Sequence, residues 1–183
     1  GATLLASGLA LEWIIIGVAI GTVIGLFGAY LVKMTAMPEM VALFNGFGGL
    51  SSLLLAWSEY HQNLSDSLFI AAVTMLSVFI GGVTFTGSMV AWGKLSGKIN
   101  QKPIIFPNQH LLNTAILLGA VVCSVLFTFY PSPPIGYLLF IIVMLVSLGF
   151  GVTSTIPIGG ADMPVVISLL NSYSGLAACA AGF

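Results

Sequence analysis

The chain has 183 residues and a formal net charge of −1; 58% of its residues are hydrophobic and only 5% are charged, which gives a mean hydropathy of +1.14. A soluble domain carries a charge on about a quarter of its residues, so this composition excludes a water-soluble globular protein. The small net charge gives no sign of a nucleic-acid partner. We therefore expect an integral membrane protein that contacts the lipid bilayer along most of its length.

Six apolar stretches follow one another, and each is long enough to cross a bilayer as a helix of about 20 residues. The predicted spans are 13–32, 38–57, 67–92, 111–130, 135–155 and 163–183. Their apolar runs are continuous rather than alternating, which argues against the strands of a membrane barrel. The sequence therefore predicts an all-α, polytopic transmembrane helix bundle that forms a single domain over residues 1–183. Because the last span is still apolar at Phe183, we expect the chain to be part of a longer protein.

The first predicted span carries a doubled GxxxG pattern, formed by Gly17, Gly21 and Gly25. Small residues at this spacing let two membrane helices approach each other closely. We therefore expect this face of the span to pack against another helix.

The four lysines predict how the chain is oriented. Lys33 lies between the first two spans, and Lys94, Lys98 and Lys102 follow the third. With alternating spans both connections fall on one side of the membrane, and the excess of positive charge predicts that this side is cytoplasmic. The connection between the fifth and sixth spans then lies on the same side.

Two spans begin with nearly the same sequence, MPEMVALFNGFGGLSS from Met37 and MPVVISLLNSYSGLAA from Met163, with six of sixteen positions identical. Both enter the membrane from the same side, as parallel repeats. Asn45 and Asn171 each lie roughly 10 Å along their helix, where an amide without a partner costs several kcal/mol. They serve either as hydrogen-bonding contacts between helices or as the lining of a shared hydrated path.

The third span carries small and polar residues on one face, within about 80 degrees of one another at the helical period. They are Thr74, Ser77, Gly81, Thr84 and Ser88. This stripe is either a packing surface, whose hydroxyls bond back to their own helix, or one wall of a polar channel. The deep part of every predicted span lacks Asp, Glu, Lys, Arg and His. The chain shows no spacing typical of a metal site, a hydrolase nucleophile or a phosphate-binding loop.

Four stretches of the chain, in the same order, resemble the β-subunit membrane domain of the proton-translocating NAD(P) transhydrogenases. They are MPEMVAL from Met37, VTFTGSMVAWGKLSGKI from Val83, KPIIFPNQH from Lys102 and GGADMPVVISLLNSYSG from Gly159. The resemblance implies an enzyme complex that transfers hydride between NAD(H) and NADP(H) while protons cross the membrane. The nucleotides would bind separate soluble domains, so this chain alone has no hydride-transfer, cofactor or metal site. The implied partners are those domains, the membrane helices of a companion α-subunit and a second copy of the complete assembly, in a bacterial cytoplasmic or mitochondrial inner membrane.

The resemblance also implies roles for individual residues. Asn171 and Ser88 resemble positions of the family's proton path, and we place Thr84 and Ser172, their polar neighbours, on the same path. Asn45, also assigned to the path, occupies a position where the family typically has histidine. Because asparagine cannot titrate near neutral pH whereas histidine can, we expect a helix of the companion subunit to supply the titrating group.

Two carboxylates resemble residues that couple the membrane domain to the NADP(H) domain. Asp162 looks like an acidic residue of the cytoplasmic loop that faces that domain, and Glu39 like one at the cytoplasmic start of the second span. Without the resemblance, isolated carboxylates in loops are usually only solvated.

Two other kinds of protein fit the residue pattern. A secondary solute or ion transporter would place a substrate-sized polar pocket at the middle of the membrane and would work without nucleotide domains. A purely structural membrane subunit would keep its activity after Asn171→Leu if folding survived.

Overall fold

The computed structural model describes residues 11–62 and 67–181, and every regular element in these ranges is helical. The helices are α1 (Leu11–Leu31), α2 (Met37–Gln62), α3 (Leu68–Leu95), α4 (Gln109–Phe129), α5 (Ile135–Thr155) and α6 (Met163–Ala181), with the short 3₁₀ turns η2 (Met34–Ala36) and η3 (Gly160–Asp162). Within these ranges, α1 to α5 are long and apolar enough to cross a membrane. The predicted all-α transmembrane bundle is confirmed.

The third helix is longer than predicted and ends at Leu95 rather than near residue 92. It stops where Gly97 adopts a left-handed backbone with φ of 71°, the conformation that commonly follows the last turn of a helix and that glycine adopts without steric cost. The amide of Gly97 donates to the carbonyl of Lys94 at 3.2 Å. Lys94, predicted to follow the third span in a loop, therefore belongs to the last turn of α3.

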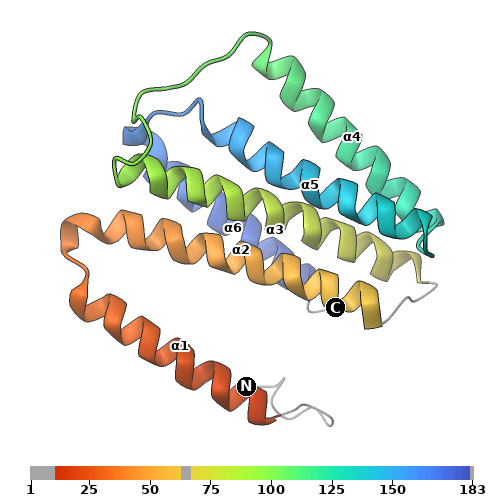
Figure 1. Cartoon of the computed structure of the whole chain (residues 1–183), viewed down its shortest axis with the longest axis horizontal. Coiled ribbons are helices and arrows are strands. Elements are labelled where there is room, and N and C mark those ends of the chain that lie inside the picture. The colour runs from red at the N-terminus through yellow and green to blue at the C-terminus, as the bar shows by residue number, and fades with distance from the viewer. Residues whose placement is uncertain (1–10, 63–66, 182–183) are drawn as a thin grey trace.

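Helix α3 is the centre of the bundle and packs against α2, α4, α5 and α6. The connections α1–α2, α3–α4 and α5–α6 lie at one end of the bundle, on the left in Figure 1, and α4–α5 lies at the other. Helices α2 and α6 consequently run in the same direction, as the alternation of the spans predicted.

The closest approach in the bundle joins α2 to α3. A Cβ atom added at Gly49 would lie 2.8 Å from the carbonyl oxygen of Gly81, so only glycine fits between the two backbones. Gly81 belongs to the predicted stripe on α3, and Thr74, Ser77, Thr84 and Ser88 of the same stripe are all buried. The stripe is thus a packing surface over most of its length.

Helix α1 lies apart from the other helices (Figure 1), and none of its residues is buried. A Cβ added at Gly17, Gly21 or Gly25 would meet no atom within 4 Å. The expected packing partner of the GxxxG face is therefore not among the described residues of this chain.

Candidate functional site

The first member of the site is a buried polar pair that joins α2 to α3. The side-chain amide of Asn45 donates to the hydroxyl of Ser88 at 2.9 Å. Asn45 is 9% exposed and Ser88 is fully buried. Helix α2 places the amide there because Gly46 and Gly49 let α3 approach closely on the same side. Asn45 therefore faces another helix rather than lipid and has the hydrogen-bond partner that an amide at this depth needs.

A serine of α6 extends this pair to a third helix. The hydroxyl of Ser174 lies 3.4 Å from Oδ1 of Asn45 and 2.8 Å from the carbonyl of Asn171 on its own helix. A serine has one hydroxyl proton, so it donates to one of these oxygens at a time. When that proton points to Asn45, Ser174, Asn45 and Ser88 form a hydrogen-bonding row across α6, α2 and α3. Ser174 is not among the path residues that the sequence predicted.

The repeat gives α2 and α6 the same local geometry where they begin. A 3₁₀ turn precedes each helix, and the residue before each turn has an extended backbone. The φ and ψ angles are −67° and 148° at Lys33 and −69° and 154° at Gly159. Each helix then places a proline in its first turn, where the missing N–H has no helical partner in any case. The two sequences therefore enter the bundle with the same local geometry.

The two asparagines of the repeat have different surroundings. Asn171 is exposed and lines a groove of about 550 Å³ between α2 and α6. The lining residues are Gly48, Ser51, Ser52, Leu55, Asn171, Ser174, Gly175 and Ala178. Because Ser174 both lines this groove and reaches Asn45, the groove adjoins the buried polar row.

Two other predicted path residues lie outside the row. Thr84 is fully buried, and its hydroxyl has no hydrogen-bond partner within the described part of the chain. Ser172 is exposed, and its hydroxyl donates to the carbonyl of Ser168 on its own helix at 3.1 Å. Neither is joined to Asn45 by a hydrogen bond.

The two predicted coupling carboxylates lie at the same end of the bundle. Asp162 is exposed at the end of η3, directly before α6, and Glu39 is half-buried in the first turn of α2. Their helices start side by side, since Ala42 of α2 and Met163 of α6 share a buried cluster with Ala91 of α3.

Lys94 is a buried cation at this same end of the bundle. The sequence did not predict that its side chain is buried. Its side chain is fully buried, and its ammonium donates to the carbonyls of Ile156 and Ile158, both at 2.6 Å, and of Lys102 at 3.3 Å. The available signal was Gly97: a terminating glycine three residues later places Lys94 in the last turn of a helix.

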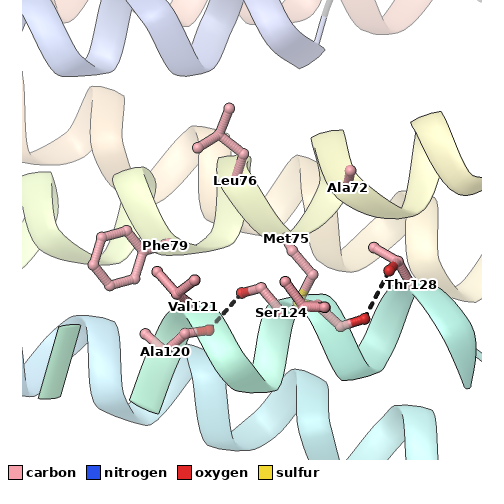
Figure 2. A pocket seen from close by; sticks show the side chains of 9 residues that line it. Ala72, Met75, Leu76, Phe79, Ala120, Val121, Ser124 and Thr128 are labelled. Carbon is pink, nitrogen blue, oxygen red and sulfur yellow. Dashed lines mark hydrogen bonds between the residues drawn. The ribbon is translucent and has the colours of Figure 1, made fainter. Parts of the chain in front are cut away.

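A second cavity, between α3 and α4, has a volume of about 210 Å³. Figure 2 shows that its two hydroxyls, on Ser124 and Thr128, turn toward their own helix, where they donate to the carbonyls of Ala120 and Val125. Apolar side chains supply the rest of the lining. This cavity therefore offers no free polar group to a hydrophilic substrate or a proton.

Comparison with known proteins connects this geometry with a family. A family model described as NAD(P) transhydrogenase beta subunit matches residues 2–183. The NAD(P) transhydrogenase subunit beta of Rhodospirillum rubrum is 39% identical over 182 residues, and the match covers 95% of this chain but 38% of that protein. The protein of the same name from strain ATCC 11170 of that organism matches over the same shares. The chain, an integral membrane helix bundle, belongs to the NAD(P) transhydrogenase beta subunit family.

Proposed function

We propose that this chain is the proton-conducting membrane domain of an NAD(P) transhydrogenase. It would couple proton translocation to hydride transfer between NAD(H) and NADP(H) bound on separate soluble domains. The observation that carries the proposal is the row Ser174–Asn45–Ser88, which joins three helices by side-chain hydrogen bonds inside the bundle. Polar groups at membrane depth are costly and commonly mark ion or proton pathways.

The row can orient a proton path but cannot hold the charge by itself. Hydroxyls and amides both donate and accept hydrogen bonds, so they can align water along a path. None of the three side chains binds a proton as a charged group near neutral pH. A coupled pump needs a group whose charge differs between two states that favour different conformations.

We place the missing titratable group on a membrane helix of the companion α-subunit, docked in the groove beside Asn171. The groove exposes Gly48, Gly175 and Ala178, which permit close approach of a helix, and it adjoins the buried row at Ser174. Histidine is the residue expected there, since its pKa lies near neutral. A companion subunit without a buried ionisable residue would contradict this assignment.

The remaining parts of the proposal concern sidedness and partners. Asp162 and Glu39 would face the NADP(H)-binding domain, on the cytoplasmic or matrix side where the lysines gather. The complete assembly would be a homodimer in a bacterial cytoplasmic or mitochondrial inner membrane. The chain would take no cofactor of its own.

The groove is also the feature that a solute transporter would need, because 550 Å³ is within the range of small-molecule sites. The two functions differ in what they require. A transporter moves its substrate without nucleotides, whereas the proposed domain moves protons only while hydride is transferred.

The deciding experiment uses proteoliposomes that contain the complete assembly and a pH-sensitive dye, to which NADPH and an NAD⁺ analogue are added. We expect a pH change that an uncoupler abolishes and that Asn171→Leu removes, because leucine cannot hydrogen-bond water in the groove. The matched control is Asn113→Leu, which makes the same replacement on α4, where the amide reaches the carbonyl of Thr153 on α5 instead. Asn113→Leu should leave most of the pH change intact.

Two results would overturn the proposal. Hydride transfer without any pH change would leave this chain as a membrane anchor. Absence of any reaction between the nucleotides would favour the transporter, which could then be tested by solute uptake into the same vesicles.

A further inference from the structure

Lys94 is a buried charge that the proposed proton path does not use. Burying an ammonium is expensive unless its donors are satisfied. Its three N–H donors match three backbone carbonyls, and two of these follow α5, whose C-terminal end carries the negative end of the helix dipole. The described part of the chain gives it no carboxylate partner. The charge is therefore held entirely by main-chain oxygens.

These three carbonyls belong to two different connections of the chain. Ile156 and Ile158 start the α5–α6 connection that leads to Asp162, while Lys102 lies in the α3–α4 connection. Two backbone hydrogen bonds also join these connections, from Gly160 to Gln101 at 2.8 Å and from Ile104 to Ile156 at 3.4 Å. The hydrogen bonds of Lys94 thus join the end of α3 to the segment that carries Asp162.

The same helix carries the buried polar row. Ser88 lies six residues before Lys94 on α3, a rise of roughly 9 Å along a continuous helix. Because Ser88 and Lys94 lie on one continuous helix, we expect a displacement of the α5–α6 connection to reach Ser88 through the three carbonyls and Lys94. Ser88 accepts the hydrogen bond of Asn45, so the geometry of the row depends on the position of α3.

We propose that Lys94 is a positioning residue that transmits movement between the Asp162 turn and the Asn45–Ser88 pair. The inference rests on the proposed function, because it assigns the mechanical link between the proton path and the face toward the NADP(H) domain. It predicts that Lys94 sets how many protons move per hydride transferred. It does not predict an effect on the hydride-transfer step itself.

The test measures proton movement and hydride transfer in the same proteoliposomes of the complete assembly, for Lys94→Met and Lys94→Arg. Lys94→Met keeps the length and loses the charge and all three donors. We expect hydride transfer to continue while the ratio of protons to hydride falls about fivefold or more, the lower end of typical coupling between sites. Lys94→Arg retains a charge and several donors and should restore the ratio to within about twofold.

The matched control is Lys102→Met, which removes an exposed charge from the neighbouring connection but leaves the backbone carbonyl that Lys94 uses. Its ratio should equal that of the wild type. If Lys94→Met does not fold, Lys94→Gln, which keeps two N–H donors, carries the same expectation for the ratio.

Several results would overturn the inference. A wild-type ratio in folded Lys94→Met or Lys94→Gln would remove any role in coupling. Failure of both variants to fold, or a parallel loss of both activities without rescue by arginine, would make the residue purely structural. A wild-type assembly that moves no protons would overturn the proposed function and this inference together, whereas a pumping wild type with unaffected variants would overturn this inference alone.

Discussion

At the residue scale, a buried side-chain hydrogen bond between Asn45 and Ser88 joins α2 to α3. Hydrogen bonds between membrane helices contribute only about 0.6 kcal/mol on average, because the unfolded chain in the membrane also finds partners. Asn45 and Ser88 therefore add little to stability. Their fixed geometry across α2 and α3 fits the orientation that the proposed proton path would require.

This view predicts a small coupling energy for the pair. In a double-mutant cycle of Asn45→Ala and Ser88→Ala, we expect a coupling of about 0.6 kcal/mol and at most about 2 kcal/mol, measured by denaturant unfolding in detergent. Ser124, which bonds only to its own helix, provides the control: Ser124→Ala with Ser88→Ala should be additive. A coupling well above 2 kcal/mol would make the pair mainly a stabilising contact.

At the element scale, glycine decides how closely two helices pack. Lipid is as apolar as the protein interior, so helices associate through shape rather than through the hydrophobic effect. The contact of Gly49 with Gly81 brings the α2 and α3 backbones together and so places Asn45 within reach of Ser88. Gly17, Gly21 and Gly25 of α1 lack such a neighbour among the described residues.

The contact predicts opposite effects for two glycine-to-alanine changes. Gly49→Ala should lower the free energy of unfolding by about 1–3 kcal/mol, since the added Cβ overlaps the α3 backbone. Gly149→Ala places a Cβ where no atom lies within 4 Å and should be neutral or stabilise by up to about 1 kcal/mol through helix propensity. Thermal unfolding of both purified variants measures the difference. Equal effects would show that the α2–α3 contact tolerates a methyl group.

At the scale of the whole molecule, one end of the bundle differs from the other. The four lysines and the turn with Asp162 all lie at the end where α2 and α6 begin. The other end carries an aromatic cluster in which Tyr60 contacts Phe127, Tyr137 and Phe140. Aromatic residues are common at membrane surfaces, whereas lysine favours the cytoplasmic side.

The asymmetry predicts which end faces the cytoplasm. In a chain with Cys123 and Cys179 replaced by alanine, Lys98→Cys should react with a membrane-impermeant thiol reagent in inverted vesicles but not in intact cells. Gln62→Cys, at the opposite end, should react in intact cells. Both native side chains are exposed, so accessibility depends on sidedness alone. Labelling of Lys98→Cys in intact cells would reverse the orientation.

The sequence by itself determined that the chain lies in lipid, that it forms helices and in which order they follow one another. With 5% charged residues, no arrangement could cover a water-facing surface, and a chain in lipid must satisfy its backbone within helices. Lengths of about 20 apolar residues then set the spans, and the alternation of these spans set the common direction of α2 and α6.

Only the tertiary structure decided which residues meet. In water, an apolar stripe marks the buried face of a helix, but a membrane helix is apolar on its lipid side as well. The pattern therefore could not show that Asn45 turns into the bundle while Asn171 lines an open groove. Nor could it show that Gly17, Gly21 and Gly25 of α1 meet no other described helix. The sequence also could not show that three backbone carbonyls bind the ammonium of Lys94. Every residue has a backbone carbonyl, so no pattern of side chains indicates which of them bind a charge.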